Sequence, residues 1–312
     1  MMNDVSVIVR ECGERTAEAC VQLLSTVAPR HEIIRVAGHP FGETLRLAYQ
    51  KGLEKNLPWT VCIDADVLVF PEAIQGLLGE ARRAPPNTFE LQGLVFDKLF
   101  VCWRPAGNHL YRTAFLRQAL SLIPDEGSSL RPESDTIAAM ARKDGPSIRL
   151  RHRVGAYDFE QSSADIYGKG ALHARKNDYL LRYLIPLWQG LSGQDNDFRV
   201  ALEAATAAAG QAGPATVDRH YWCAQPSNDE KARQALTEVS DPERYVLDLL
   251  SRLGPAEDEI RSKFQRELDC LVFPTVGRWH RPWQTIRGRL ASAVRAMRFA
   301  RAVCLDGRLR GR

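Results

Sequence analysis

The stretch Val61-Cys62-Ile63-Asp64-Ala65-Asp66-Val67-Leu68 decides the fold of this chain. Its apolar run predicts a buried strand over residues 60–63, directly followed by two carboxylates one residue apart. In open α/β sheets, ligands bind outside the carboxyl ends of the strands, where these carboxylates would lie. Carboxylate oxygens suit Mg²⁺ or Mn²⁺, which can in turn hold a diphosphate. Asp64 and Asp66 are therefore candidate metal ligands, although aspartates at strand ends also cap turns and helices.

The residues around this stretch alternate between strand and helix patterns. Runs of apolar residues predict strands, and apolar residues spaced by three to four positions predict helices. The predicted elements are, in order, strand Val5–Val9, helix Thr16–Val27, strand Ile33–Val36, helix Glu43–Lys55 and, after Asp66, helix Pro71–Arg83. This order predicts an α/β fold with a mainly parallel sheet and helices on both faces.

The rest of the chain predicts three parts. Residues 1–178 form the α/β domain, which also contains two strands within Phe89–Trp103 and a strand at Ser147–Val154. Residues 179–277 are almost wholly helical in pattern. Residues 278–312 form a separate basic segment.

The composition of the chain excludes a disordered, a collagen-like and a cysteine-stapled protein. The chain has 312 residues, of which 45% are hydrophobic and 26% are charged, as expected for a folded protein with its own core. Its start lacks the pattern of a signal peptide, and no apolar run approaches the ~20 residues of a membrane helix. The seven cysteines form no Cys-x-x-Cys pair. We therefore expect free thiols in a reducing, cytoplasmic compartment.

Residues 278–312 contain ten arginines and one aspartate, whereas the whole chain has a net charge of only +4. Apolar residues recur there at steps of three or four, which predicts a basic amphipathic helix. Such a helix can lie on an anionic membrane surface, so the protein is expected to be peripheral at the inner face of the membrane. An apolar stripe packed against the body is the alternative. Nucleic acid is not an expected partner, although its phosphates attract the same charge.

Pro132 predicts the start of a helix that carries Glu133 and Asp135 in its first turn. The helix dipole there favours ionised carboxylates by about 0.3–1 kcal/mol. An ionised carboxylate can take the proton of an attacking hydroxyl, so both residues are candidate general bases. Acidic residues also occur in first turns for stability alone.

Other polar residues follow the ends of predicted strands. Arg10, Glu11 and Thr16 come after the first strand and are candidates to contact a base or a ribose. His109 is a candidate to face an acceptor. The arginines of 149–153 alternate along one face of a strand, where they line a wall of the site or protect a sheet edge.

Taken in order, these motifs resemble the GT-A-fold glycosyltransferases, in particular the family 2-like group, over roughly residues 5–140. The resemblance is carried by Val5–Val9, Ala48-x-x-x-Gly52-Leu53, Asp64-Ala65-Asp66, Gly107-Asn108-His109-Leu110-Tyr111-Arg112 and Arg131-Pro132-Glu133-Ser134-Asp135. Two stretches depart from the family. The loop after the second strand, Ala37-Gly38-His39-Pro40, lacks the usual aspartates, and the family's Ala-Arg-Asn reads Ala48-Tyr49-Gln50.

The resemblance implies a metal-dependent transferase of hexosyl type. It would move a sugar from a UDP- or GDP-type donor to a saccharide or lipid-linked acceptor, with inversion. Asp64 and Asp66 would hold Mn²⁺ or Mg²⁺, with His173 as third ligand, and Arg112 would lie beside the donor sugar. Asp135 lies nearer than Glu133 to the family's second acid, the general base.

Lys169, Arg175 and Lys176 would neutralise the departing diphosphate, or form a solvated basic face.

Two other functions stay open. A nucleotidyltransferase can share the architecture, but it usually has a Gly-rich basic loop where this chain has Glu11-Cys12-Gly13-Glu14-Arg15. A non-catalytic binding module is favoured by the missing aspartates of the second loop, whereas Asp64 and Asp66 favour an enzyme.

Overall fold

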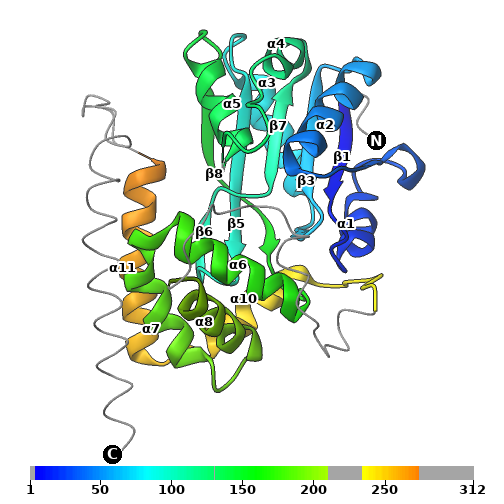
Figure 1. Ribbon diagram of the computed structural model, residues 1–312. Coiled ribbons are helices and arrows are strands. Elements are labelled where there is room, and N and C mark those ends of the chain that lie inside the picture. Colours follow the sequence, from blue (N-terminus) through cyan, green and yellow to red (C-terminus); the bar gives the residue numbers. More distant parts are fainter. Residues whose placement is uncertain (1–3, 130, 210–233, 274–312) are drawn as a thin grey trace, which may run out of the picture. The chain divides into compact units, whose positions relative to one another are not determined.

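The computed structural model describes residues 4–129, 131–209 and 234–273 (Figure 1). These residues divide into two compact units. The first unit contains residues 4–165 and 234–254, and the second contains 166–209 and 255–273. The division between the two units falls inside the helix Ser163–Lys176.

The first unit is built on a mixed sheet of eight strands. The strands are β1 (Val5–Glu11), β2 (Ile34–Ala37), β3 (Trp59–Asp64), β4 (Val67–Val69), β5 (Glu90–Asp97), β6 (Cys102–Arg104), β7 (Asn108–Arg112) and β8 (Ser147–Tyr157). They follow the order β2-β1-β3-β7-β5-β8-β4, and β6 pairs with β5. The sheet is parallel between β1 and its neighbours β2 and β3, and again between β5 and β8, while the other pairs are antiparallel.

In the parallel part of the sheet, the order in which successive strands are added reverses at β1. The chain leaves β1 for β2 on one side and then crosses to β3 on the other, so β1 and β3 enclose the switch point of the sheet. Right-handed crossovers place α1 (Ala17–Leu24) and α2 (Phe41–Lys55) on opposite faces. The carboxyl ends of β1 and β3 meet in register, with Arg10 opposite Asp64.

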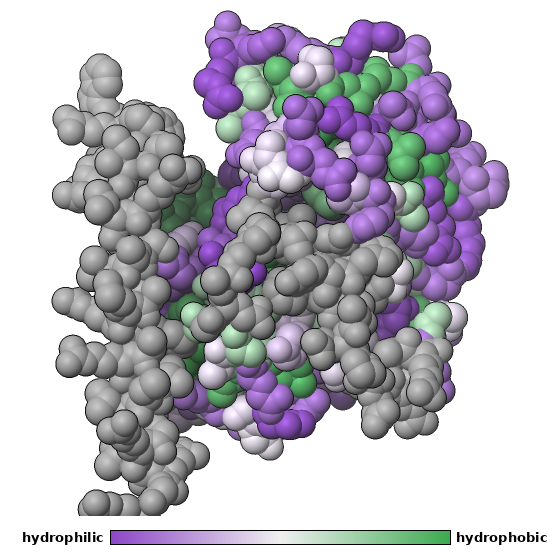
Figure 2. Space-filling model, in the orientation of Figure 1, coloured by the Kyte–Doolittle hydropathy of each residue, from purple (hydrophilic) through white to green (hydrophobic). Residues whose placement is uncertain are grey.

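One face of the sheet is covered by α2, α4 (Leu116–Leu120) and α5 (Pro132–Ala141), which contact one another. Every second residue of the strands faces these helices, among them Ile8, Cys62 and Tyr111. They form one buried apolar cluster with helix residues such as Leu45 and Met140. On the face of the molecule seen in Figure 2, hydrophilic residues predominate where Figure 1 shows α2, α4 and α5.

The remaining helices of the first unit are α3 (Ala73–Arg83), α10 (Pro242–Ser251) and the short turns η1 (Arg30–Glu32) and η2 (Thr113–Phe115). Helix α3 packs on β5 and β8, and α10 packs on β8. The side chain of Asp241 caps α10, as it accepts hydrogen bonds from the first-turn amides of Glu243 and Arg244.

The second unit is helical. It contains most of α6 (Ser163–Lys176), then η3 (Asp178–Leu180), α7 (Leu181–Leu191), α8 (Asn196–Ala209) and α11 (Pro255–Val272). Helix α7 packs against α8 and α11, and the rings of Tyr183 and Phe264 stack with centroids 4.9 Å apart. No helix within the described ranges is both long and apolar enough to cross a membrane. The basic segment 278–312 lies outside the described residues.

Candidate functional site

The candidate site lies at the carboxyl ends of β1 and β3, at the switch point of the sheet. Arg10 is 3% exposed and donates from Nε to Asp64 Oδ1 at 2.8 Å, with Nη2 2.7 Å from the same oxygen. Its Nη1 pairs with Glu133 Oε1. One guanidinium therefore joins two carboxylates that lie 69 residues apart in the sequence. Burial opposes the charge of Arg10, but Asp64 and Glu133 raise its pKa well above its usual value.

Glu133 reaches the sheet from the first turn of α5. Pro132 occupies the first position of this helix, where its missing N–H costs no hydrogen bond, and Glu133 follows it in the first turn. Glu133 Oε1 also accepts a hydrogen bond from the hydroxyl of Tyr111 at 2.5 Å, and Oε2 lies 3.0 Å from His109 Nε2. Burial works against ionisation, but Arg10 and His109 hold the pKa of Glu133 well below its usual range.

His109 continues this contact network across the sheet. Its Nδ1 lies 2.8 Å from Glu90 Oε1, and Glu90 Oε2 accepts from Arg149 Nη1 at 2.6 Å. Burial lowers the pKa of His109, but Glu133 and Glu90 outweigh it and raise the pKa to about 8. We call the chain Asp64–Arg10–Glu133–His109–Glu90–Arg149 the charge network. Negative and positive groups alternate along it, on the face covered by α5.

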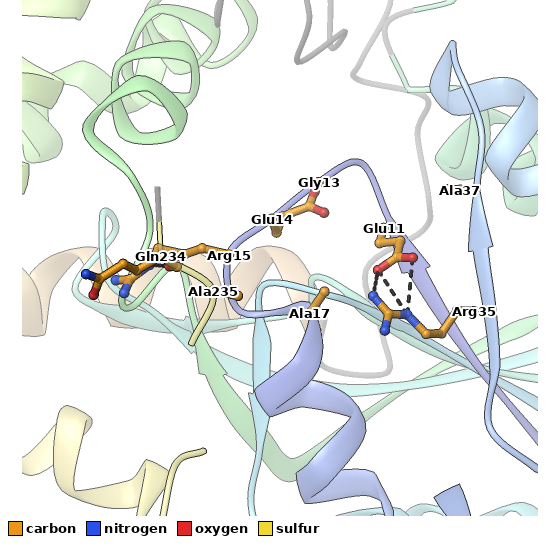
Figure 3. A pocket seen from close by; sticks show the side chains of 9 residues that line it. All are labelled: Glu11, Gly13, Glu14, Arg15, Ala17, Arg35, Ala37, Gln234 and Ala235. Atoms are coloured by element: carbon orange, nitrogen blue, oxygen red, sulfur yellow. Dashed lines mark hydrogen bonds and ion pairs between the residues drawn. The ribbon is translucent and has the colours of Figure 1, made fainter. Parts of the chain in front are cut away.

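An open pocket lies beside the charge network, at the carboxyl ends of β1 and β2 and the start of α1 (Figure 3). Its volume is about 430 Å³. Figure 3 shows the Glu11 carboxylate paired with Arg35 on one side and Arg15 on the other. Arg35 Nη2 lies 2.6 Å from Glu11 Oε2. Arg15 donates from Nε to the carbonyl of Gln234 at 3.0 Å. The other lining residues are Gly13, Glu14, Ala17, Ala37 and Ala235.

Asp64 and Asp66 are the two carboxylates predicted to hold Mg²⁺ or Mn²⁺, and the structure shows their surroundings. Within the described ranges, no group of three histidine, cysteine, aspartate or glutamate side chains could hold a metal. Both Arg10 contacts go to Oδ1 of Asp64, whose side chain is 25% exposed. Asp66 is 5% exposed, and its backbone carbonyl accepts from the amide of Asp158. Mg²⁺ commonly takes one or two carboxylates and completes its shell with phosphate and water.

The structure separates the two candidate bases. Asp135 follows Glu133 by two residues, which turns its side chain about 200° around the helix. Its carboxylate is exposed and accepts from the hydroxyl of Ser129 at 2.5 Å. Of the two, Glu133 is thus the one in contact with Arg10.

Two other predicted residues lie apart from Asp64 within the first unit. Thr16 is fully buried beneath the loop after β1 and donates to the carbonyl of Ala65 at 2.8 Å. Arg112 pairs in register with Trp59, at the opposite end of β3, about 16 Å away along the strand. It stacks over the Trp59 ring and donates to the carbonyls of Thr88 and Pro85.

Gly107, the first residue of the motif Gly107–Arg112, does lie beside the site. Gly107 accepts through its carbonyl from the amide of Asp64 at 2.9 Å. Its φ of +60° favours glycine. A Cβ there would also lie 2.7 Å from Val67 Cγ2.

The remaining predicted residues, Lys169, His173 and Lys176, belong to the second unit. His173 is 8% exposed, and its Nδ1 lies 3.0 Å from the amide nitrogen of Asn177. Arg175 lies on the same helix, α6.

Glu90 and Tyr111 belong to the site, but sequence reasoning missed them. Arg149, which the sequence placed on a wall of the site or at a sheet edge, pairs with Glu90. A signal was available for Glu90, because Glu90 and Gln92 are polar residues at alternate positions of a strand that is otherwise apolar. Such alternation indicates a shared face. It does not tell which residues of other strands share that face.

Comparisons with known proteins give likeness of fold only. No family model matches the chain, and no curated protein matches it. Similar solved structures include a glycosyltransferase involved in the glycosylation of the major capsid of PBCV-1, 14% identical, with a TM-score of 0.37, covering 50% of this chain and 94% of its own.

Another is the mannosyltransferase PcManGT from Pyrobaculum calidifontis, solved with GDP-Man and Mn²⁺. It is 12% identical, has a TM-score of 0.36, and covers 86% of this chain and 87% of its own. A third is A197 from STIV, at 11% identity and a TM-score of 0.33, covering 47% of this chain and 81% of its own.

Proposed function

We propose that this chain is a glycosyltransferase, which moves a sugar from a nucleoside-diphosphate sugar to the hydroxyl of a saccharide or lipid-linked acceptor. The observation that carries the proposal is the contact of Arg10 with both Asp64 and Glu133 at the switch point of the sheet. Ligands of open α/β sheets bind there. An open pocket of about 430 Å³ lies alongside for a nucleoside.

In this proposal the pocket residues Glu11, Arg15 and Arg35 face the nucleoside. Asp64 is directed at the diphosphate, and Arg10 holds Asp64 and Glu133 in place, since it is itself buried. Mn²⁺ or Mg²⁺, bound jointly by Asp64 and the donor, would stabilise the negative charge that develops on the leaving diphosphate.

We assign the general base to Glu133 because its carboxylate contacts the guanidinium that also binds Asp64. The acceptor oxygen bonds to the anomeric carbon, the bond from that carbon to the diphosphate breaks, and the hydroxyl proton passes to Glu133. A single displacement of this kind inverts the anomeric centre. The low pKa of Glu133 keeps the carboxylate ionised but makes it a weak base.

A nucleotide screen tests the proposed donor class. The full chain is heated with UDP, GDP, CDP or dTDP, with and without Mn²⁺. A ligand at a hundred times its Kd stabilises the folded state by about 2.7 kcal/mol, which raises Tm by several degrees. We expect one nucleotide to do so, and more strongly with Mn²⁺. If no nucleotide raises Tm, the proposal is wrong.

Two variants in one helical turn test the general base. Glu133→Gln should retain nucleotide binding and lower kcat by about 10²–10⁴-fold, the usual contribution of a general base. Asp135→Asn removes an exposed carboxylate two residues away. Loss of transfer in Asp135→Asn, with activity retained in Glu133→Gln, would assign the base to Asp135.

A non-catalytic binding module is the second candidate. It is favoured by the loop after β2, Ala37-Gly38-His39-Pro40, which contains no acidic residue. It predicts that a nucleotide binds but that neither transfer nor hydrolysis of the donor sugar is detected by mass spectrometry.

A further inference from the structure

His109 lies between two carboxylates in the interior of the first unit. It is 6% exposed, with Nδ1 2.8 Å from Glu90 Oε1 and Nε2 3.0 Å from Glu133 Oε2. An ionised carboxylate can only accept hydrogen bonds, so both ring nitrogens must donate. Both contacts can be hydrogen bonds at the same time only in the doubly protonated, positively charged form of the ring.

The charges linked to His109 favour the same form. Glu90 (β5) and Glu133 (α5) contact the ring, and each pairs in turn with an arginine, Arg149 (β8) and Arg10 (β1). Arg10 also pairs with Asp64 (β3). Tyr111 stacks on the ring, with Tyr49 beyond it and Cys62 opposite in register, and burial raises the pKa of each of these three groups. Three carboxylates thus face two guanidiniums, and a positive His109 balances them.

A second arrangement is available to the neutral ring. The amide nitrogen of Gln92 lies 3.2 Å from His109 Nε2. When Nε2 carries a proton, two donors face each other there. When Nε2 has lost its proton, its lone pair accepts from Gln92 while Nδ1 still donates to Glu90. The surroundings of His109 therefore supply partners for both protonation states.

The two oxygens of Glu133 differ in what holds them. Oε1 keeps Arg10 and the Tyr111 hydroxyl whichever form His109 takes. Within the part of the chain that the structure describes, Oε2 has one polar partner, His109 Nε2. Loss of the Nε2 proton thus releases one oxygen of a carboxylate that stays fixed by the other.

We propose that His109 is a positioning residue that gates the proposed base: with Nε2 protonated it occupies Glu133 Oε2, and on losing that proton it turns to Gln92 and frees Oε2 to accept the acceptor's proton. This inference rests on the proposed function. The Nε2 proton leaves to solvent before the transfer. The proton from the acceptor hydroxyl then goes to Oε2 as the new glycosidic bond forms and the diphosphate departs.

The state of His109 can be measured without any activity. In the full chain labelled with ¹⁵N-histidine, the ring shifts are followed from pH 6 to 9.5, with His109→Gln used for assignment. We expect both nitrogens of His109 to be protonated at pH 7, a midpoint near pH 8, and a neutral ring protonated at Nδ1 above it. A neutral ring at pH 7, or a neutral form protonated at Nε2, would overturn the inference.

The pH profile of transfer tests the link to Glu133. We expect kcat to rise about tenfold between pH 7 and pH 9, because the fraction of neutral His109, which frees Glu133 Oε2, rises about tenfold across a midpoint near pH 8, while KM changes little. Glu90→Gln removes a carboxylate that stabilises charged His109, so its midpoint should move to lower pH. Gln92→Leu removes the donor to neutral His109, so its midpoint should move to higher pH.

The exposed histidine variant His31→Gln is the matched control and should keep the wild-type profile. An active enzyme whose midpoint is the same in wild type, Glu90→Gln and Gln92→Leu would overturn the role of His109 and leave the transferase standing. Absence of transfer with every donor would overturn the proposed function, and this inference with it. Should Glu90→Gln and Gln92→Leu fail to fold, the titration of His109 in the wild-type chain, assigned with His109→Gln, still decides its protonation.

Discussion

At the scale of single residues, the site is held together by buried charges that depend on one another. Taking a charge out of water costs several kcal/mol, and the cost is recovered only when partners are close and hydrogen-bonded. Arg10 meets this condition through Asp64 and Glu133, and His109 meets it through Glu133 and Glu90. The charge network therefore fixes geometry more than it adds stability.

The raised pKa of His109 makes stability depend on pH. Its pKa is about 8 in the folded chain, against an ordinary value of 6.5. Charged His109 thus stabilises the fold fully below pH 6.5, and this contribution is lost as pH rises through 8. We predict that the free energy of unfolding falls by about 2 kcal/mol between pH 6 and pH 9 relative to His109→Gln.

Urea unfolding at a series of pH values measures this difference. Cysteine thiols are present in both proteins, so their ionisation in the unfolded chain cancels in the comparison. Identical pH dependence in wild type and His109→Gln would contradict the prediction.

At the scale of elements, helix α2 lies so close to β3 that a glycine is needed between them. A Cβ on Gly52 would come 2.6 Å from Thr60 Oγ1 and 2.8 Å from Leu116 Cδ1. Thr60 Oγ1 also lies 2.9 Å from the hydroxyl oxygen of Thr113, so it has little room to move. This close approach sets the distance between α2 and β3, the strand that carries Asp64.

Two glycines of α2 therefore respond differently to the same added methyl group. Gly52→Ala should lower the free energy of unfolding by about 1–3 kcal/mol through overpacking. Gly42→Ala, where nothing lies within 4 Å of the new Cβ, should be neutral or stabilise by up to about 1 kcal/mol. Urea titration of both variants measures the contrast, and equal effects would show that the contact with β3 does not matter.

At the scale of the whole molecule, charge is divided along the sequence. The net charge of the chain is +4, but residues 278–312 contain ten arginines against one aspartate, which leaves the rest of the chain negative. A segment of this kind favours an anionic surface, at about 1 kcal/mol per basic residue close to it. The acidic body, by contrast, is repelled by the same surface.

We predict that the full chain sediments with phosphatidylserine vesicles at low salt and is released at high salt. Replacing Arg287, Arg295 and Arg298 by glutamine should weaken this binding by at least tenfold. Phosphatidylcholine vesicles are the control and should not bind. Equal sedimentation of wild type and the triple variant would rule out this segment as the contact.

Local patterns in the sequence determined the first strands, the helices between them and the position of Asp64 at a strand end. They also determined the start of a helix at Pro132. These features depend on residues within a turn or a strand of one another, so alternation and spacing reveal them. The same reasoning placed Arg10 and Glu133 among the candidates.

Only the tertiary structure decided which candidates meet. Arg112 ends the strand that begins near Asp64, and the antiparallel pairing of β7 carries it to the far end of the sheet. Asp135 and Glu133 differ by a rotation around α5, which no short-range pattern fixes against the strands. The partnership of His109 with Glu90 depends on the register of β7 and β5, where a slip of one residue would turn Glu90 to the other face. Register and face are set by packing between distant segments, and that is why the charge network could not be predicted from the sequence.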